Sequence, residues 1–495
     1  MAKRLDFEKL EPRGVLSWFK KICAIPHGSY NEAALAEMLK HELNKAGCYV
    51  KQFSSGAVFA RKAATKGFEK KPIVLLQAHM DMVLTKTADV KDDLTTTPIK
   101  PFYDTADGYI KCNGTTLGAD DGIGVAVIME IMTSDKYQHG PLEVLLSVTE
   151  EVDIQHCMNS IPKKYFKAKH LINLDIESPE KMYTSSNGGD RVTCERMLKL
   201  KPIHKGTKTY LVQISHLDGG HSALAIHNPL NNAIQLLCES MYTFTQDHSK
   251  VSLVSLEGGN AFNAIPRKAD MIIQADPKDL PELKKHLRHS LDVAIKMAQG
   301  LDKEGRVMVK LADKQVKQAC DYEQTEEILW FYTYIQTGIE RMDITMKHIF
   351  ASDNLGMVRT ENNVLKTCLL PRCFFEEGIR YQFDRIRFYG SKFGFKNFQR
   401  LKTSTPWLTE HPDKVQIAQT WSKCFTKVTG RYTFPAKDPG GIEPAAIIEN
   451  SPQLINHAIA VGPRMYDCHT PLERLEVKSV NEWWKTLLLV LKEIK

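Results

Sequence analysis

The chain has 495 residues, with 66 Lys and Arg against 59 Asp and Glu, so its formal net charge is +7. Apolar residues make up 43% and charged residues 25%, which is ordinary globular usage and excludes wholesale disorder. Because the small positive excess is diluted along the chain without a long basic run, we expect no binding of nucleic acid. No window offers the roughly 18 uninterrupted apolar residues of a membrane span, so we expect no membrane association either.

The eleven cysteines run from Cys23 to Cys468 without a Cys-x-x-Cys pair. An odd and scattered set differs from the dense, even-numbered frameworks of secreted disulfide proteins. Residues 1–10 also lack the apolar stretch of a secretory signal peptide. We therefore expect reduced thiols and a cytoplasmic protein.

The first elements along the chain are predicted to be helices and then buried strands. Pro12 stands near a first helix start, and Ser29 with Glu32 forms a capping-box pattern before a second helix that Gly47 ends. Residues 125–132 carry apolar side chains at helical spacing. Four short apolar runs are typical of strands buried on both faces; they are 73–76, 144–148, 171–174 and 458–461. Strands that alternate with helices predict an α/β fold.

The middle of the chain has a different pattern. Short runs with strand or helix character follow one another there; they are 210–214, 231–242, 271–275, 307–311 and 344–350. We interpret residues 192–398 as an inserted α+β domain. It would divide a single α/β domain into two parts, residues 1–191 and 399–495.

Histidine and carboxylate residues follow the buried runs. In chain order these residues are His79, Asp81, Glu150, Glu151, Asp175 and His469. Ligands of open α/β sheets bind outside the carboxyl ends of the strands, so we expect one edge of the sheet to gather these side chains. Imidazole and carboxylate groups suit zinc, with cobalt or manganese as alternatives.

Asp120 is the natural bridge between two such ions, because the glycines around it let the backbone approach closely. Asp81 could hold the imidazole of His79 through the second ring nitrogen. Glu150 and Glu151 are interpreted as part of an extended segment, so that they point to opposite sides. One of them could then bind metal while its neighbour takes a proton from a bridging water. Each pattern is common by itself, and their joint occurrence in this order carries the prediction.

These stretches resemble the zinc dipeptidase family of aminoacyl-histidine dipeptidases, also called Xaa-His or cytosol non-specific dipeptidases. The resemblance spans nearly the whole chain, and its motifs lie at residues 75–83, 115–124, 148–151, 171–175, 218–222, 263–267, 461–463 and 469–474. It implies a catalytic α/β domain with a central mixed sheet flanked by helices. It also implies that the inserted domain is a lid through which two subunits form a homodimer. Residues 352–356 resemble a further family segment, to which we assign no chemistry.

The resemblance also implies two Zn²⁺ per subunit. His79, Asp120 and Asp175 would hold one ion. Asp120, Glu151 and His469 would hold the other.

Four residues carry other roles in the resemblance. Glu150 would be the general base for a hydroxide held between the two ions, and Asp81 would be the partner of His79. His221 matches a lid histidine that reaches the neighbouring subunit's active site and polarises the substrate carbonyl, with a turn or core position as the alternative. Asn263 matches a position implicated in substrate contact, and a packing role is equally open.

One segment departs from the family pattern. The family often has His-Ala-Gly-Leu-Glu-Cys-Gly where this chain reads Asp-Pro-Gly-Gly-Ile-Glu-Pro at residues 438–444. The histidine and the cysteine of the family pattern are absent here, and its glutamate is kept as Glu443. All the expected metal ligands are present. We expect hydrolysis of dipeptides, Xaa-His dipeptides among them. An N-acyl-amino-acid amidohydrolase, an aminopeptidase and a non-catalytic metal-binding relative stay open as alternatives.

Overall fold

The computed structural model describes residues 4–248 and 251–495. Residues 1–3, part of the N-terminal stretch interpreted above, and residues 249–250 of the expected insertion lie outside the described residues. The chain forms two compact units. Unit 1 consists of Met1–Ser186, Trp407–Asp438 and Ile442–Lys495, and unit 2 consists of Asn187–Pro406 and Pro439–Gly441. The sequence predicts the insertion between residues 191 and 399. The catalytic role expected for the outer parts and the lid and dimerisation role expected for the insertion stay predictions.

Unit 1 is built on an eight-stranded mixed sheet with the strand order β2-β3-β7-β4-β8-β26-β9-β25. Its strands are β2 (Tyr49–Gln52), β3 (Val58–Lys62), β4 (Val74–His79), β7 (Leu142–Ser147), β8 (His170–Asn173), β9 (Lys181–Ser186), β25 (Phe434–Asp438) and β26 (Ala458–Ala460). Strands β7, β4, β8 and β26 are parallel neighbours, and every residue in them is buried. They correspond to the four predicted apolar runs, and the expected central mixed sheet is confirmed.

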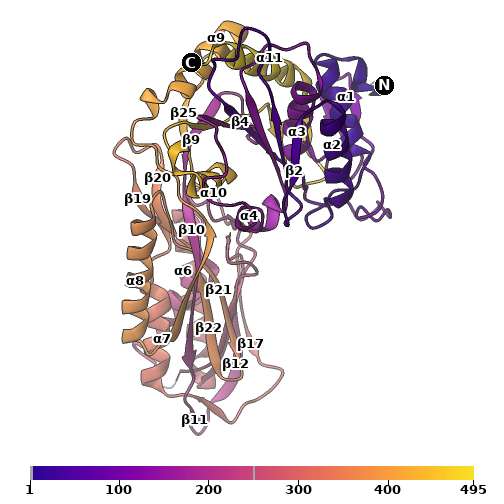
Figure 1. The fold of residues 1–495 in the computed structure, drawn as a ribbon. Helices are drawn as coiled ribbons and strands as arrows, with labels where there is room; N and C mark the ends of the chain where they lie inside the picture. Colours follow the sequence, from indigo (N-terminus) through magenta and orange to yellow (C-terminus); the bar gives the residue numbers. More distant parts are fainter. Residues whose placement is uncertain (1–3, 249–250) are drawn as a thin grey trace. The chain divides into compact units, whose positions relative to one another are not determined.

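Helices flank this sheet. They are α1 (Arg13–Cys23), α2 (Ala33–Lys45), α3 (Ala119–Thr133), α4 (Glu150–Asn159), α9 (Gln416–Thr429), α10 (Glu443–Asn450) and α11 (Val477–Glu493). Helices α1, α2 and α3 lie together beside the sheet, and α9 lies along α11 (Figure 1). A smaller sheet joins β1 (Arg4–Leu5), β5 (Phe102–Asp104), β6 (Tyr109–Lys111), β28 (Arg474–Glu476) and β27 (Met465–Tyr466). Single 3₁₀ turns cover Phe7–Lys9, Pro277–Asp279, Pro412–Lys414 and Pro452–Leu454.

The chain leaves unit 1 after Ser186 and returns to it at Trp407. These two residues form an antiparallel bridge within unit 1. The Ser186 N–H donates to the Trp407 carbonyl at 2.8 Å, and the Trp407 N–H donates back at 2.9 Å. The two ends of the long insertion are therefore fixed side by side.

Unit 2 contains a large sheet in which every strand pair is antiparallel. Its order is β17-β12-β16-β14-β21-β22-β10-β23-β20-β19, and β24 pairs with β10. The strands are β10 (Gly188–Met197), β12 (Lys208–Ser215), β14 (Ser252–Gly258), β16 (Ala269–Ala275), β17 (Arg306–Leu311), β19 (Gly338–Met342), β20 (Ile349–Asp353), β21 (Leu355–Glu361), β22 (Val364–Leu369), β23 (Arg372–Cys373) and β24 (Lys396–Ser404).

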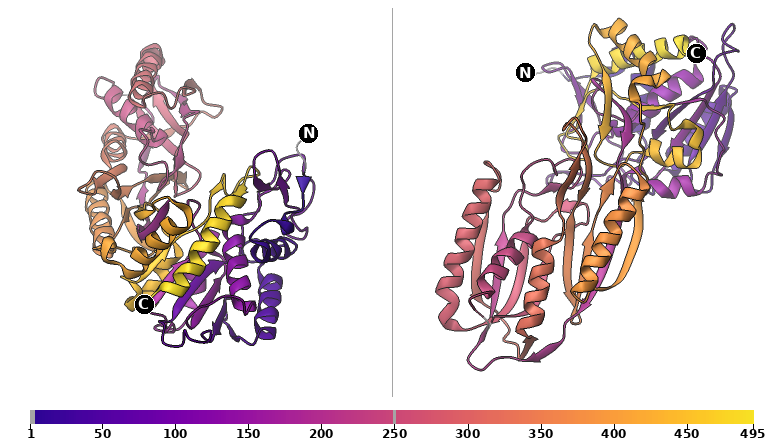
Figure 2. Two further views of the ribbon diagram at one scale, coloured as in Figure 1. Left: turned by 90° about the horizontal axis from the view of Figure 1, so that it is seen from above. Right: turned by 90° about the vertical axis from the view of Figure 1, so that its left-hand side faces the viewer.

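Four helices lie in a row against one face of this sheet (Figure 2, right). They are α5 (Ala233–Thr245), α6 (Leu280–Met297), α7 (Tyr322–Tyr334) and α8 (Glu376–Lys392). Two small ladders complete the unit, β11 (Leu200–Pro202) with β18 (Gln318–Cys320) and β13 (Gly220–His221) with β15 (Ala264–Ile265). The α+β character predicted for the insertion is confirmed.

The strand character predicted for residues 344–350 is wrong over most of that run. Only the end of it belongs to β20, and residues 344–348 form the turn between β19 and β20. The Asp343 carboxylate accepts hydrogen bonds from the Thr345 hydroxyl at 2.8 Å and the Lys347 N–H at 3.2 Å. Such a local carboxylate cap favours a turn over a strand, and it leaves Ile344 fully exposed.

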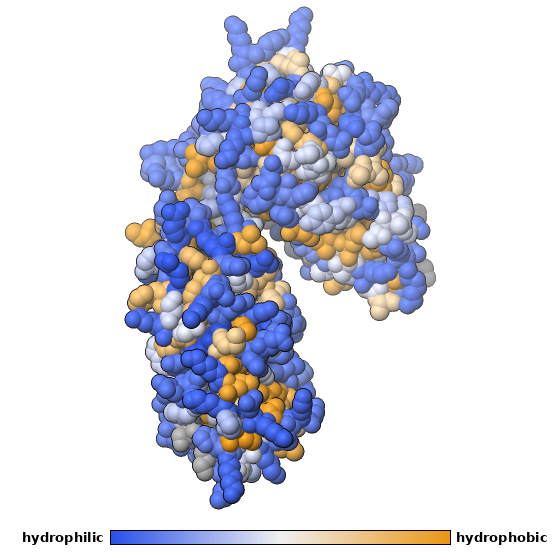
Figure 3. Space-filling view, turned by 60° about the horizontal axis from the view of Figure 1, so that its bottom comes forward, coloured by the Kyte–Doolittle hydropathy of each residue, from blue (hydrophilic) through white to orange (hydrophobic). Residues whose placement is uncertain are grey.

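Over residues 4–248 and 251–495, no helix combines the length and the hydropathy needed to cross a bilayer. All eleven cysteines lie in the described part of the chain as free thiols. The face drawn in Figure 3 is mostly hydrophilic, with smaller apolar areas between the polar side chains.

Candidate metal centre

The parallel strands of unit 1 bring predicted residues to one edge of the sheet. His79 is the last residue of β4, and Asp175 follows β8 by two residues. Glu150 and Glu151 begin α4, which comes shortly after β7. Because β7, β4 and β8 are parallel neighbours, their carboxyl ends and the residues that follow them meet at the same edge.

Asp120 lies between two histidines. Its Oδ1 is 3.1 Å from Nε2 of His79, and its Oδ2 is 3.1 Å from Nε2 of His469. Asp175 Oδ1 lies 3.7 Å from His79 Nε2, and Glu151 Oε1 lies 2.9 Å from His469 Nε2. Besides His79–Glu150–Glu151 and Asp120–Glu177–Cys468, the potential ligand atoms form two groups, His79–Asp120–Asp175 and Asp120–Glu151–His469, and within each the atoms lie within 4.8 Å of one another. They have the same members as the two ligand sets expected from the sequence.

A buried glutamate holds the backbone that leads to Asp120. The Glu473 carboxylate accepts hydrogen bonds from the N–H groups of Leu117 at 2.7 Å, Gly118 at 3.0 Å and Ala119 at 2.8 Å. Gly118 has a φ of 69°, a left-handed conformation that glycine adopts without strain. Sequence reasoning gave Glu473 no role, and its position four residues after His469 was the one available signal.

Asp81 and His79 contact each other differently from the expectation. His79 Nδ1 lies 2.9 Å from the backbone carbonyl of Asp81 and 3.5 Å from its carboxylate, so the N–H donates to the carbonyl. The Asp81 carboxylate instead accepts from the N–H groups of Glu150 at 2.9 Å and Glu151 at 3.3 Å, and from the Ser29 hydroxyl at 2.8 Å. Because Nδ1 donates to this carbonyl, the imidazole of His79 directs Nε2 at Asp120 and Asp175, and Nε2 is the nitrogen that would bind a metal ion.

The extended segment predicted for Glu150 and Glu151 is wrong, because these residues are the first two of helix α4. Thr149 precedes them in a left-handed conformation and makes no side-chain cap, so the Asp81 carboxylate supplies the acceptor for the free N–H groups. Successive helical residues are rotated by roughly 100°, so the two side chains still diverge.

The capping box predicted for α2 is wrong as well. The helix begins at Ala33 without any side-chain cap. The Ser29 hydroxyl donates to Asp81, and the Glu32 carboxylate accepts from the Thr149 N–H at 2.9 Å. Both side chains therefore stabilise the start of α4 instead of their own helix.

Buried carboxylates dominate the electrostatics of the two groups. Burial by itself would lower the pKa of His79, but Asp175 and Asp120 raise it well above its ordinary value. Hydrogen bonds to Asp120 and Glu151 raise the pKa of His469 to about 11. Burial, reinforced by Asp120, raises the pKa of Asp175 to about 8. The site therefore concentrates negative charge around two imidazoles, and cations would stabilise it.

Glu150 lies in the same environment without belonging to either of these two groups. Burial raises the pKa of its carboxyl group well above the ordinary value, and the charges of Asp175 and Glu151 add to the effect. A carboxylate whose protonated form is favoured can take up a proton and hold it.

A buried polar network lies behind this edge of the sheet, and Glu443 is part of it. The Glu443 carboxylate accepts hydrogen bonds from Gln77 and from the Ser147 hydroxyl, the latter at 2.7 Å. The Asn173 amide donates to Gln77 at 2.7 Å, and its own oxygen accepts from the Asp175 N–H at 3.3 Å. Burial raises the pKa of Glu443 to about 7. This glutamate, retained in the divergent segment 438–444, is thus connected to the candidate ligand Asp175.

The other two predicted site residues, His221 and Asn263, belong to unit 2. His221 lies in β13 and pairs with Ala264 of β15. The Ser222 N–H donates to the Asn263 carbonyl at 2.9 Å, so the structure brings these two predicted residues together.

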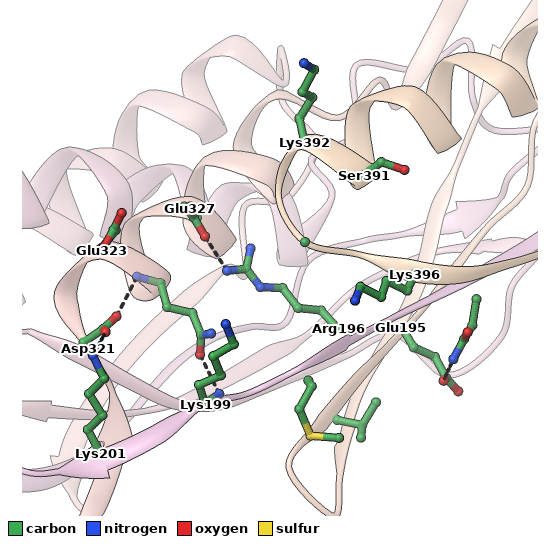
Figure 4. A pocket seen from close by; sticks show the side chains of 15 residues that line it. Glu195, Arg196, Lys199, Lys201, Asp321, Glu323, Glu327, Ser391, Lys392 and Lys396 are labelled. Atoms are coloured by element: carbon green, nitrogen blue, oxygen red, sulfur yellow. Dashed lines mark hydrogen bonds and ion pairs between the residues drawn. The ribbon is translucent and has the colours of Figure 1, made fainter.

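A hollow of about 810 Å³ on unit 2 contains none of the predicted site residues. Some of its charged side chains point toward one another, whereas Lys392 points away (Figure 4). Arg196 pairs with Glu327, and Lys201 pairs with Asp321. Because side chains of both charges line it, this hollow does not indicate a ligand of either sign.

No protein-family model matches the chain. The chain is 30% identical over 494 residues to the cytosol non-specific dipeptidase of Escherichia coli (strain K12), with 99% of each sequence covered. Its structure is similar to that of the aminoacylhistidine dipeptidase from Vibrio alginolyticus, with a TM-score of 0.85, 25% identity and coverage of 99% of this chain and 98% of that one. The di-peptidase Dug1p from Saccharomyces cerevisiae shares the fold, with a TM-score of 0.51, 14% identity and coverage of 98% and 96%.

Proposed function

The chain belongs to the family of the cytosol non-specific dipeptidase, a family of peptidases, and from this we propose that it hydrolyses the peptide bond of dipeptides, Xaa-His dipeptides among them. The observation that carries the proposal is the pair of ligand groups His79–Asp120–Asp175 and Asp120–Glu151–His469, which have Asp120 in common. We further propose a cytoplasmic enzyme that forms a homodimer through unit 2 and binds two Zn²⁺ per subunit.

The donor set fits divalent metal ions. Each group offers one imidazole nitrogen and carboxylate oxygens, the ligands that zinc takes in catalytic sites. Each oxygen of Asp120 faces a different histidine, as a bridging carboxylate would. His79 and Asp175 would complete one site, and Glu151 and His469 the other. When bound, two such cations polarise a carbonyl group and lower the pKa of water to roughly 7.

Glu150 is the proposed general base. Its backbone N–H is fixed by the Asp81 carboxylate, which holds the start of α4 against the end of β4. The Glu150 carboxylate would take the proton of the attacking water and pass it to the leaving amine.

His221 is the proposed hydrogen-bond donor to the carbonyl oxygen of the substrate. Its Nδ1 accepts from the N–H groups of Ala223 at 3.3 Å and Leu224 at 3.5 Å, so the ring proton resides on Nε2. An Nε2–H donor could stabilise the negative charge that develops on the oxygen. We propose that it acts on the site of the neighbouring subunit, and that Asn263 contacts the substrate.

The test is hydrolysis by the purified chain, with and without added Zn²⁺ after chelation. The substrates are Xaa-His and other dipeptides, tripeptides and N-acetyl amino acids. We expect the dipeptides to be cleaved, the activity to be lost on chelation, and two metal ions per chain on reconstitution. Preferred cleavage of N-acetyl amino acids or longer peptides would instead indicate an amidohydrolase or an aminopeptidase. Bound metal without any hydrolysis would indicate a non-catalytic relative.

A further inference from the structure

Three sequence motifs meet in unit 2. The strands β13 and β15 pair Gly220 with Ile265 and His221 with Ala264, which joins the motif at 218–222 to the motif at 263–267. Each strand has only two residues, and so short a ladder is marginal by itself. The third motif, residues 352–356, supplies the missing support.

Asn354 holds the segment around Asn263 by both protons of its side-chain amide. Its Nδ2 donates to the Phe262 carbonyl at 2.9 Å and to the Ala264 carbonyl at 3.0 Å. Both partners are acceptors, which fixes the orientation of the amide. Asn354 is 1% exposed, and its own carbonyl accepts from the Leu370 N–H at 2.9 Å, which ties it to the large sheet. The two carbonyls that flank Asn263 are thus anchored to a rigid element.

Gly356 brings the same segment into backbone contact. A Cβ atom at Gly356 would lie 2.4 Å from the Phe262 carbonyl oxygen and 2.7 Å from its Cα, closer than real Cβ atoms come. Phe262 therefore rests directly on the beginning of β21. The Asn263 side chain is only partly covered, and within the described residues it makes no hydrogen bond of its own, so its amide is available to a ligand.

We propose that Asn354 is a positioning residue that presents Asn263 to the backbone of a dipeptide substrate. The proposal rests on the proposed function. It explains what holds Asn263 in position for its contact with the substrate. Asn354 also lines a hollow of about 300 Å³ beside Ile265, which leaves room for the segment 262–264 to shift once the two hydrogen bonds are lost. A displacement of about 1 Å at a substrate contact can change rates by as much as 10²-fold.

The test compares four variants in dipeptide hydrolysis. Asn354→Ala and Asn263→Ala are each expected to raise KM about tenfold with kcat within about twofold, since a lost binding contact acts on KM. The double variant is expected to be no worse than Asn263→Ala alone, because Asn354 acts through Asn263. Asn232→Ala is the matched control. It removes a buried hydrogen bond of 2.8 Å to the neighbouring Leu355 carbonyl and a helix cap, without touching residues 262–264.

The outcomes separate the two proposals. Asn232→Ala should lower the melting temperature and leave KM unchanged. Three results would each overturn the positioning role. The first is an equal rise of KM in the Asn232→Ala control, and the second is a normal KM for Asn354→Ala when that of Asn263→Ala is raised. The third is a rise of KM in the double variant that adds the effects of the two single variants. An unaffected Asn263→Ala would do the same. If Asn354→Ala does not fold, Asn354→Asp keeps the volume, removes both donors and should raise KM equally. A wild-type chain without dipeptide hydrolysis would contradict the proposed function itself.

Discussion

Asp81 shows how much of the candidate site depends on single buried carboxylates. It accepts hydrogen bonds from residues 52 and 69 positions away, Ser29 and Glu150. The sequence predicts Asp81 as a partner of His79 because the two residues are neighbours. The sequence does not predict that the Asp81 carboxylate binds the N–H groups at the start of α4, because a contact between residues 69 positions apart leaves no local pattern in the sequence. Residues next to a strand end are predictable, and their long-range partners are not.

At this scale we expect Glu150→Gln to lower kcat by roughly 10²- to 10⁴-fold, because an amide cannot accept the proton of the attacking water. Metal content, measured by mass spectrometry of the metals, should equal that of the wild type. The matched control is Glu180→Gln, which changes a unit 1 acid paired with Arg464 and Arg431. It should retain full turnover. A fully active Glu150→Gln variant would exclude Glu150 as the base.

The start of α3 is the clearest case at the scale of an element. Glycines around Asp120 predict a close backbone approach, and the structure has Gly118 in a left-handed conformation there. The residue that fixes this turn, Glu473, is 356 positions from Leu117, and periodicity carries no information about such a contact. For the same reason the capping box at Ser29 and Glu32 misled the prediction, because tertiary partners took both side chains.

Glu473→Ala is expected to weaken metal binding by roughly 10- to 100-fold, the usual effect of losing a group that orients a ligand. Three N–H groups would lose their acceptor, and the turn that carries Asp120 would loosen. Competition with a chelator measures the affinity. Glu476→Ala, at the end of the strand β28 that begins directly after Glu473, removes a partner of Arg464 and should leave the affinity unchanged. Equal affinities in both variants would contradict the role of Glu473.

Strand β20 carries a prediction about pH. Burial raises the pKa of Asp353, its last residue, to about 8 from an ordinary value of 3.8. Between about pH 4 and pH 8 the folded chain therefore keeps a proton that the unfolded chain has released, and stability is lost as the pH rises through this window. Each pKa unit corresponds to about 1.4 kcal/mol.

Asp353→Asn should remove this loss, because an amide does not titrate. Calorimetry at pH 5.5 and pH 8 should find the melting temperature of the variant falling less between the two values than that of the wild type. The exposed Asp384 of α8 gives the control, Asp384→Asn, which should follow the wild type. A variant with the wild-type pH dependence would show that Asp353 is ionised in the folded chain.

At the scale of the whole molecule, the change of pattern near residue 192 predicts an insertion, and the structure has a second unit from Asn187 to Pro406. Composition and periodicity reach this far because each unit has its own buried core. Composition and periodicity do not predict whether two chains associate, because the residues that would form the interface follow no common pattern along the sequence. The homodimer therefore stays a proposal with its own test.

Co-expression of Glu150→Gln with His221→Ala tests it. Each variant alone should be inactive, but a mixed dimer in which His221 serves the partner's site contains one intact site. Random pairing should then restore about a quarter of the wild-type activity. Co-expression of Glu150→Gln with Asp175→Ala should restore nothing, because both changes affect the site of their own subunit. Sedimentation measures whether dimers form. If dimers form but activity is not restored, His221 does not act on the site of the neighbouring subunit.

The bridge between Ser186 and Trp407 has a consequence for how such a protein can arise. Because the fold of unit 1 holds these two positions side by side, an insertion of any length between them leaves the backbone of unit 1 unchanged. The loop-closure entropy of the added stretch grows only slowly with its length. Evolution could therefore exchange or enlarge the inserted stretch while strands β4 and β8, which position His79 and Asp175, kept their register.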